Sequence, residues 1–324
     1  MELSVFGDKD RFSFNDLQGC FDFSVSLQAV IPYLIALKSF SLSDAQALVA
    51  PRDPESHKGT YGHGLLVAGS KGMAGAAVMA AQAALRSGIG LLTVCTPECN
   101  RIILQTAVPE AMVVPCGTDC IDSLPTDLSR YSAIAIGPGL TSNDITRQMQ
   151  QTLMEHACAP LVVDADALNN IASSPTLLSY LSEKDILTPH LGEFRRLAFS
   201  QPLSEGKSDS SLLQEEASAF SMRHHLYLIL KGHRTAVCSP TGDVSLNTTG
   251  NAGMATGGSG DVLTGILLGL CAQGYSAWDA ARLGVFIHGL AGDLAATALT
   301  EIAMTATDII RFLPQAWKSV RPSR

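Results

Sequence analysis

The sequence is poor in basic residues. It holds 22 Lys and Arg against 30 Asp and Glu, which gives a formal net charge of −8. A nucleic-acid-binding surface normally shows a basic patch, so this balance argues against a nucleic-acid partner. The charge does not exclude a phosphate ligand, because backbone N–H groups and one or two local cations suffice to hold it.

A long uninterrupted apolar run is also missing. The most apolar early stretch, residues 25–40, is broken by Pro32, Lys38 and several serines. It falls short of the roughly 20 apolar residues that a membrane span needs. The first residues, MELSVFGDKD, show neither the basic start nor the cleavage site of a signal peptide. We therefore expect no membrane partner and a cytoplasmic location.

Metal-binding cysteine motifs are absent as well. Two pairs of the eight cysteines, Cys95/Cys99 and Cys116/Cys120, have CxxxC spacing, but no paired CxxC motifs and no matching histidine cluster accompany them. Cys95 lies in an apolar run, where a thiol acts as a small hydrophobe. We expect reduced, structural cysteines, as in a reducing cytoplasm.

Apolar residues are plentiful, and their pattern indicates the fold class. They make up 46% of the chain against 16% charged residues, which favours a large core over disorder. From Leu65 onward, short apolar runs alternate with helical patterns, as in LLVAG, AAVMAAQAALRSG and LLTVC. This alternation predicts an α/β fold with a mainly parallel sheet and helices on both faces. Ligands of such sheets bind beyond the carboxyl ends of the strands, where Gly, Asp and Pro–His follow these runs.

The two ends of the chain differ from this middle part. Residues 1–40 show no clear period, so we treat them as an N-terminal appendage of unassigned role and residues 41–324 as one domain. The last third predicts three short strands within LYLILKGHRTAVCSPTGDVSLN. Apolar helices are then expected near residues 263–271, 277–294 and 305–318.

The most informative segment is NAGMATGGSGDVLTG, residues 251–265. Glycine lets the backbone approach an anion closely, and a helix that starts near Ser259 presents unpaired N–H groups and a positive dipole end. Asp261 would aim a carboxylate at the same space, or would merely stabilise the helix dipole. A P-loop is excluded, because GxxxxGK[ST] does not occur. The anion hole predicted for phosphate comprises Gly257, Gly258, Ser259 and Gly260.

Three further motifs follow predicted strands. The segment Lys231–Thr235 (KGHRT) offers a Lys, an Arg and a hydroxyl beside a glycine, which suits phosphate or ribose but also a solvated turn. His190 in TPHLGEF is a candidate ligand contact, or a histidine satisfied by a neighbouring backbone group. Asp164 and Asp166 in VVDADALN are candidate metal-linked carboxylates, or helix caps.

Taken together, these motifs resemble the ribokinase-like fold, in which a glycine-rich anion hole and its aspartate activate a hydroxyl. Within this fold, the motifs most resemble the ADP-dependent NAD(P)H-hydrate dehydratase family. The resemblance runs from about Ser41 to the C-terminus. The motifs that carry it are residues 58–94 (KGTYGHG through GIGLLTV), IGPGL, VVDADALN, ILTPHLGEF, LKGHRT and NAGMATGGSGDVLTGI.

The resemblance implies a three-layer α/β/α fold and a lyase. Its reaction would return the S epimer of hydrated NADH or NADPH (NADHX or NADPHX) to the intact cofactor, with ADP as co-substrate, Mg²⁺ as cofactor, and AMP and phosphate released. Asp261 would be the catalytic base. Contacts to the hydrated cofactor would be Ala76, Gly139, His190 and Asp261. Contacts to the nucleotide would be Lys231, Gly232, His233, Arg234, Thr235 and Gly260. Glu193 would hold Mg²⁺ through water, although His190 stands where the ribokinase-like NxxE motif has Asn.

Two rival functions share these features. A small-molecule kinase of the same fold, such as a hydroxyethylthiazole kinase, needs the same anion hole and base, but KGHRT and TPHLGEF favour the dehydratase. A non-catalytic nucleotide-binding protein would be expected to show a damaged GGSGD or KGxxT, and both are intact.

The resemblance also bears on partners. Fused family members carry an epimerase domain ahead of the dehydratase, and the residues ahead of Ser41 are too few to encode it. We expect a dehydratase alone, with the epimerase as a possible functional partner. A truncated or reorganised gene also fits, because PRDPESHKGTYGH resembles the junction of fused members. A homo-oligomer is expected, with a tetramer favoured.

Overall fold

The structure is a computed structural model that describes residues 38–198 and 210–321. Residues 1–37 of the predicted appendage lie outside the described residues. The last three residues of the predicted appendage form strand β1 (Lys38–Phe40), which pairs in parallel with β10 (Val244–Asn247).

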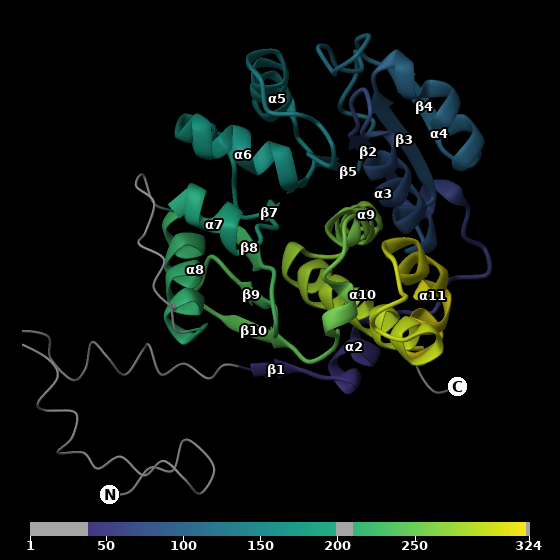
Figure 1. Cartoon of the computed structure of the whole chain (residues 1–324), viewed down its shortest axis with the longest axis vertical. Coiled ribbons are helices and arrows are strands. Elements are labelled where there is room, and N and C mark those ends of the chain that lie inside the picture. The colour runs from purple at the N-terminus through teal and green to yellow at the C-terminus, as the bar shows by residue number, and fades with distance from the viewer. Residues whose placement is uncertain (1–37, 199–209, 322–324) are drawn as a thin grey trace, which may run out of the picture. The chain divides into compact units, whose positions relative to one another are not determined.

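The described strands form one ten-stranded sheet in the order β1-β10-β9-β8-β7-β6-β5-β2-β3-β4 (Figure 1). Neighbouring strands are parallel except where β9 pairs with β8 and with β10. The predicted mainly parallel sheet is therefore confirmed. The other strands are β2 (His63–Val67), β3 (Leu91–Thr96), β4 (Met112–Pro115), β5 (Ala133–Ile136), β6 (Leu161–Val163), β7 (Ile186–Leu187), β8 (Tyr227–Leu230) and β9 (Ala236–Cys238).

Helices cover both faces of this sheet. Side chains of a strand point to opposite faces in turn, and the buried strand residues divide into two cores accordingly. Leu66 and Val94 join the core under α2 (Leu42–Leu48), α3 (Ala74–Arg86), α4 (Arg101–Ala107), α9 (Ser259–Ala272), α10 (Ala277–Leu299) and α11 (Ala306–Ser319). Leu65 and Val67 join the core under α5 (Asp144–His156), α6 (Ala165–Ser173), α7 (Leu191–Ala198) and α8 (Ser210–His224). The three-layer α/β/α architecture is confirmed, and Figure 1 shows the two helix groups on either side of the strands.

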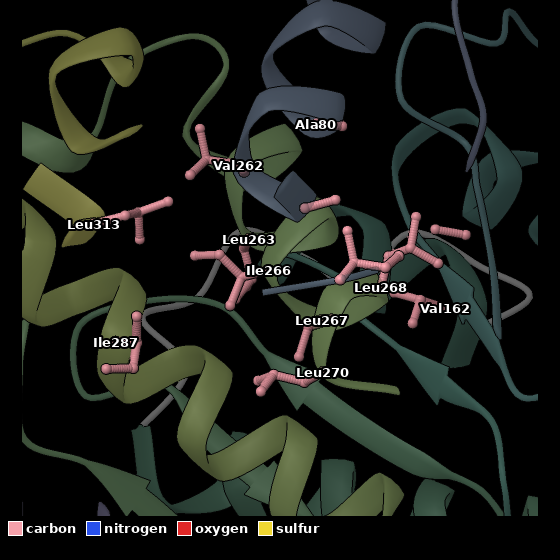
Figure 2. Packing of buried hydrophobic residues seen from close by; sticks show 14 of the residues in the cluster. Ala80, Val162, Val262, Leu263, Ile266, Leu267, Leu268, Leu270, Ile287 and Leu313 are labelled. Atoms are coloured by element: carbon pink, nitrogen blue, oxygen red, sulfur yellow. The ribbon is translucent and has the colours of Figure 1, made fainter. Parts of the chain in front are cut away.

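Helix α9 is apolar on all sides because it is enclosed by the sheet, α3, α10 and α11. Figure 2 shows its side chains, among them Leu263 and Ile266, within this core. A Cβ added at Gly265 would meet the carbonyl oxygen of Ala80 in α3, so the two helices approach closely. The helix begins at Ser259, where the glycine-rich motif predicted it. The core thus fixes the position of the helix N-terminus.

The order of the strands creates a switch point next to β2. From β2 the chain passes to β3 and β4 on one side, and then returns to β5 on the other side of β2. Such a switch point is where open α/β sheets bind ligands, beyond the carboxyl ends of the strands. Most predicted site segments follow β2, β5, β6, β7 and β8, so the topology brings them to this edge, whereas the glycine-rich segment comes after β10 and leads into α9.

Two predictions from composition concern the described residues as a whole. Across residues 38–198 and 210–321, no helix combines the length and the apolar character that crossing a membrane requires. The seven cysteines in this part of the chain carry free thiols, and Cys95 is buried, as expected for a structural thiol.

Candidate active site

At the switch point, the turn after β5 packs against the start of α3. Gly139 has φ +60°, and a Cβ added there would lie 2.9 Å from the Cβ of Met73 and 3.1 Å from the Cβ of Ala76. Ala76 is buried on α3. The structure therefore brings together Ala76 and Gly139, two of the residues predicted to contact the hydrated cofactor. Their contact leaves no room for a side chain at Gly139.

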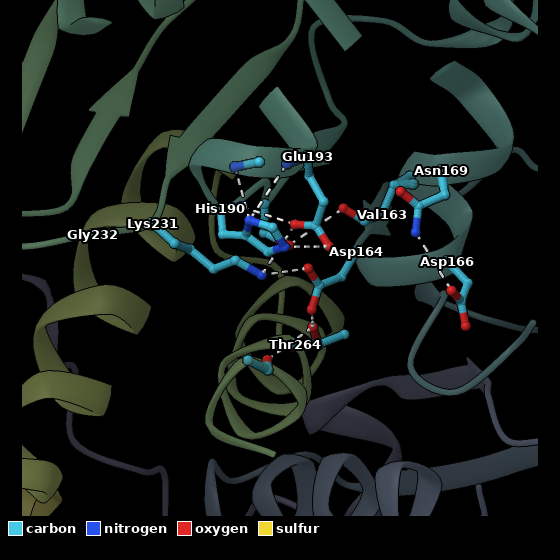
Figure 3. Close-up of polar contacts among 12 residues, drawn as sticks. Val163, Asp164, Asp166, Asn169, His190, Glu193, Lys231, Gly232 and Thr264 are labelled. Atoms are coloured by element: carbon cyan, nitrogen blue, oxygen red, sulfur yellow. Dashed lines mark hydrogen bonds and ion pairs between the residues drawn. The ribbon is translucent and has the colours of Figure 1, made fainter. Parts of the chain in front are cut away.

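A buried carboxylate lies at the end of the next strand. Asp164 directly follows β6, is 1% exposed, and accepts a hydrogen bond of 2.7 Å from Lys231 Nζ through Oδ1. Its other oxygen, Oδ2, accepts a hydrogen bond of 2.7 Å from the hydroxyl of Thr264 in α9 (Figure 3). Burial would raise the pKa of Asp164, but Lys231 and the hydroxyls of Thr264 and Thr188 hold it below its ordinary value. The carboxylate is thus kept charged inside the protein.

These contacts bear on one of the alternatives for the VVDADALN motif, the helix cap. Asp164 occupies the N-cap position of α6, but its side chain makes no capping hydrogen bond. Asp166 accepts a hydrogen bond of 2.9 Å from the backbone N–H of Thr141, just after the Gly139 turn. The cap interpretation therefore fails for the Asp164 side chain. Asp166 instead fastens α6 to the segment that carries Gly139.

His190 and Glu193 form a reciprocal pair at the start of α7. The Nδ1 atom of His190 accepts hydrogen bonds from the backbone N–H groups of Gly192 (3.0 Å) and Glu193 (3.4 Å). Glu193 accepts a hydrogen bond of 2.8 Å from the His190 backbone N–H, and its Oε1 lies 3.3 Å from His190 Nε2. Because Nδ1 accepts, the ring proton belongs on Nε2 in the neutral imidazole. The His190 side chain is 54% exposed, so one edge of a fixed ring remains open to a ligand.

Strands β7 and β8 place this pair beside Lys231. His190 and Lys231 form a parallel β-bridge, and the Lys231 N–H donates to the carbonyl of Pro189 (2.9 Å). The Lys231 ammonium also lies 3.9 Å from Glu193 Oε2. One cation is therefore shared between the buried carboxylates of Asp164 and Glu193.

The rest of KGHRT forms a turn at the surface. The Thr235 hydroxyl donates to the carbonyl of Gly232 (3.0 Å) and accepts from its N–H (3.3 Å), which closes the turn. Gly232, His233 and Arg234 are exposed. The structure thus brings Lys231 into the polar cluster, whereas His233 and Arg234 lie on the outer part of the turn.

The glycine-rich segment ends in the N-terminus of α9. Gly258 is the N-cap with φ +91°, and a Cβ there would collide with Met79 of α3. A Cβ added at Gly257 would meet nothing within 4 Å, so this face of the loop is open. A Cβ added at Gly260 would lie 3.3 Å from Lys231 Nζ. The predicted anion hole therefore has an open face, a helix N-terminus and an adjacent ammonium group.

Ser259 in this loop has a partner on α10. Its hydroxyl lies 3.3 Å from Nε2 of His288. Burial and, to a smaller extent, the Lys231 ammonium lower the pKa of His288 to about 4, while a hydrogen bond with Ser259 opposes the shift. His288 is therefore neutral near pH 7, and it holds the first residue of α9 without adding charge.

Asp261 lies in the first turn of α9 and is half-buried. Burial and the negative charges of Asp164 and Asp166 together raise its pKa to about 7, although the Lys231 ammonium opposes them. A simple surface carboxylate at a helix N-terminus would show a lowered pKa instead. A carboxylate with a pKa near the working pH is suited to general base catalysis.

Backbone strain concentrates around the same cluster. Three non-glycine residues with positive φ lie here: Thr141 at 70°, Ala165 at 49° and Arg234 at 56°. Such conformations cost energy and persist where the surrounding structure enforces them, frequently at functional sites. They flank Gly139, Asp164 and Lys231, respectively.

The side chains of the described residues do not form a metal cage. No group of three or more His, Cys, Asp or Glu side chains is placed to hold a metal ion within residues 38–198 and 210–321. Both oxygens of Glu193 face His190, and one also faces Lys231. A metal ion at this edge would therefore need other ligands, such as water and phosphate oxygens.

Comparison with known proteins shows the family of the chain. A sequence model described as NAD(P)H-hydrate dehydratase matches residues 64–315. The chain belongs to the NAD(P)H-hydrate dehydratase family. The resemblance predicted from the motifs is confirmed, and the dehydratase is favoured over the kinase alternative.

Relatives of two lengths support this family. The bifunctional NAD(P)H-hydrate repair enzyme of Moorella thermoacetica is 40% identical over 277 residues, which is 83% of this chain and 52% of that enzyme. The chain thus spans about half the length of the bifunctional relatives. The ADP-dependent (S)-NAD(P)H-hydrate dehydratase of Bacillus subtilis is 34% identical over 275 residues, covering 84% of this chain and 95% of that protein.

Solved structures agree with this NAD(P)H-hydrate dehydratase fold. The ADP/ATP-dependent NAD(P)H-hydrate dehydratase from Bacillus subtilis, co-crystallized with ATP/Mg²⁺, has a TM-score of 0.75 and 31% identity, and covers 89% of this chain and 100% of that one. The hydroxyethylthiazole kinase from Pyrococcus horikoshii has a TM-score of 0.54 at 15% identity, which shows the ribokinase-like fold alone.

The sequence motifs included this cluster but not its internal contacts. Thr264 and His288 were not among the predicted site residues, and the role of Asp164 was left open between metal ligand and cap. Thr264 carries a readable signal, because it stands one helical turn after Gly260 and so lies on the same face of α9. His288 has no such signal, since its partner Ser259 lies on another helix.

Proposed function

We propose that this chain catalyses the ADP-dependent dehydration of the S epimer of NADHX or NADPHX to NADH or NADPH, with release of AMP and phosphate. Family membership supports this reaction. The observation that carries it is Asp261: a half-buried carboxylate with a pKa of about 7, at a helix N-terminus beside the Lys231 ammonium.

The chemistry has two stages. Asp261 takes the proton of the hydroxyl group on the hydrated ring while the hydroxyl oxygen attacks the β-phosphorus of ADP, and AMP departs. Phosphate is a better leaving group than hydroxide. It then leaves with the C–O bonding electrons, pushed by the lone pair of the ring nitrogen. Loss of a proton from the neighbouring carbon restores the double bond.

The anion hole stabilises the first stage. The N–H groups of Gly257–Gly260 face the charge that develops on the equatorial oxygens of the transferring phosphoryl group. Lys231 adds a positive charge next to Gly260. A helix N-terminus and a nearby cation together favour negative charge at this point.

The two reactants occupy adjacent positions beyond the carboxyl ends of the strands. The hydrated cofactor contacts Ala76 and Gly139 at the switch point, with the open edge of His190 on its other side. The nucleotide lies over Lys231, Gly232, His233, Arg234, Thr235 and Gly260. Asp261 stands between the two groups. The packing of Gly139 on Ala76 supports the first placement, and the contact of Lys231 with Gly260 supports the second.

Magnesium enters this proposal with the nucleotide. Mg²⁺ usually keeps several waters and binds through one or two carboxylates plus substrate phosphates, which agrees with the lack of a metal cage among the described side chains. Its charge would offset that of the phosphates. A water-mediated contact from Glu193 stays a prediction, and the contacts of Glu193 favour its role in orienting His190.

We extend the proposal to the setting of the enzyme. Residues 41–324 form the dehydratase domain, which acts in a reducing cytoplasm as a homo-oligomer. Because the bifunctional relatives are about twice as long, an epimerase that interconverts the two hydrates is a suitable functional partner.

One assay separates this function from the kinase. The purified chain is incubated with hydrated NADH, Mg²⁺ and either ADP or ATP, and the dihydronicotinamide absorbance is followed. The proposal requires the absorbance to return, with one AMP and one phosphate formed per NADH when ADP is used. Failure with both nucleotides, together with a stable phosphorylated product from another alcohol, would establish a kinase.

A further inference from the structure

The Asp164 carboxylate links three distant parts of the chain at the centre of the site. It is almost fully buried, and its two oxygens bind Lys231, 67 residues away, and Thr264, 100 residues away. A buried charge is costly unless it is paired and hydrogen-bonded. Here the ammonium group of Lys231 and the hydroxyl of Thr264, which both border the anion hole, supply the pairing and the hydrogen bond.

We propose that Asp164 is a positioning residue that locks the Lys231 ammonium and the first turns of α9 together, and that its fixed negative charge keeps Asp261 basic enough to take the substrate proton. This inference rests on the proposed function for its kinetic readout. Its binding and titration readouts do not depend on turnover.

The first part of the proposal rests on distances. Lys231 Nζ is held 2.7 Å from Asp164 Oδ1 and 3.9 Å from Glu193 Oε2, next to the backbone of Gly260. The lysine side chain has several rotatable bonds, so an anchored ammonium loses less entropy when a phosphate binds. Asp164 therefore prepares Lys231 for the nucleotide.

Thr264 connects Asp164 to helix α9. Its hydroxyl donates to Asp164 Oδ2 (2.7 Å) and also lies 3.2 Å from the carbonyl of Gly260, one turn earlier. The contact ties the first turn of α9 to the end of β6. The N–H groups of the anion hole and the carboxylate of Asp261 are thereby held in one orientation.

The second part concerns charge. A Cβ added at Gly260, the residue before Asp261, would lie 3.7 Å from Asp164 Oδ2 and 3.3 Å from Lys231 Nζ, so both charges border this turn of α9. The charged groups that act on Asp261 are these two and Asp166 on α6, while His288 on α10, which contacts Ser259, is neutral. The two aspartates disfavour the ionised form of Asp261, and Lys231 favours it. Removal of the Asp164 charge should therefore make Asp261 a weaker base.

The principal test is Asp164→Asn in the full chain. We expect AMP affinity, measured by calorimetry, to fall about 10-fold because Lys231 loses its anchor. We expect the titration midpoint of Asp261, followed by carboxyl carbon NMR and assigned with Asp261→Asn, to move down by about half to one pH unit. The acidic limb of the kcat/KM profile for the hydrate should move in the same direction. A folded Asp164→Asn protein with native AMP affinity and an unchanged Asp261 midpoint would overturn the proposal.

A second pair of variants keeps the proposal testable if Asp164→Asn does not fold. Thr264→Val removes the hydroxyl with little change in shape, and Thr264→Ser retains it. We expect Thr264→Val to lower kcat about 10-fold with a native Asp261 midpoint, since the Asp164 charge is still present. Thr264→Ser should restore kcat. Equal kcat values for Thr264→Val and the native chain would contradict the claim that the contact between Asp164 and Thr264 positions α9.

The proposed function and this inference fail separately. If the native chain restores no NADH from the hydrate, the proposed function fails. AMP affinity and the Asp261 midpoint of Asp164→Asn still decide the role of Asp164, because neither measurement needs turnover.

Discussion

The Cα of Gly265 in α9 faces the carbonyl oxygen of Ala80 in α3, so that even a methyl group at this position would overlap the neighbouring backbone. This contact sets the depth at which α9 sits in the core. Because the anion hole and Asp261 belong to the first turn of the same helix, the contact also bears on the site.

We predict that Gly265→Ala destabilises the protein by about 2 kcal/mol, because the helices must separate to admit a Cβ. Chemical denaturation measures the change in the free energy of unfolding. Gly75→Ala in α3 is the matched control: a Cβ there meets nothing within 4 Å, and alanine favours a helix. A Gly265→Ala protein as stable as this control would contradict the close packing.

The raised pKa of Asp261 predicts a pH-dependent effect on stability. From about pH 3.8 to about pH 7 the folded chain keeps a proton on Asp261 that the unfolded chain has released, so the free energy of unfolding falls as pH rises. Above about pH 7 Asp261 is ionised in both states, so the free energy of unfolding no longer changes with pH through this group. Asp261→Asn does not titrate, so its stability relative to the native protein should rise by about 4 kcal/mol between pH 4 and pH 8. Thermal unfolding at both pH values measures the difference. A constant difference would show that Asp261 has an ordinary pKa.

Gly139 is predicted to control binding of the hydrated cofactor. Gly139→Ala puts a methyl group against Met73 and Ala76 and strains a backbone with φ +60°. We expect KM for the hydrate to rise at least about 10-fold, with AMP affinity close to native. Gly274→Ala is the control for strain alone, since its φ is +89° and a Cβ there meets nothing within 4 Å. Equal KM values for the two variants would remove Gly139 from the binding site.

His190 is predicted to cap α7 as well as to face the cofactor. Its Nδ1 atom accepts hydrogen bonds from two backbone N–H groups, so His190→Ala should cost about 1 kcal/mol of stability. Asn also caps helices well, so His190→Asn should retain most of this stability. If Asn also raises KM for the hydrate, the ring has a binding role beyond the cap. Denaturation and initial-rate kinetics on the two variants separate these effects.

The fold could be predicted from the sequence wherever the pattern was long and strong. Residues 277–294 and 305–318 were expected as helices, and α10 and α11 lie there, because apolar runs with helical spacing cover both segments. Strand β4 (Met112–Pro115) was not predicted, although its residues are apolar, because it is a short edge strand that is only partly buried.

The site could be predicted only as a set of segments. The residues near Ser259 signalled a helix N-terminus through their glycines, which is local information. The link from Asp164 to Lys231 and Thr264 spans 67 and 100 residues, and it exists only because the parallel strands end at the same edge. Likewise, the pKa of Asp261 depends on burial by elements that are distant in the sequence, so it could not be predicted from the residues around Asp261.

The most direct test of the account compares the native chain with Asp261→Asn on hydrated NADH, ADP and Mg²⁺. The native chain should restore the dihydronicotinamide absorbance, and Asp261→Asn should lose at least about 100-fold in kcat while it binds AMP with near-native affinity. Near-native turnover by Asp261→Asn would contradict the assignment of Asp261 as the base.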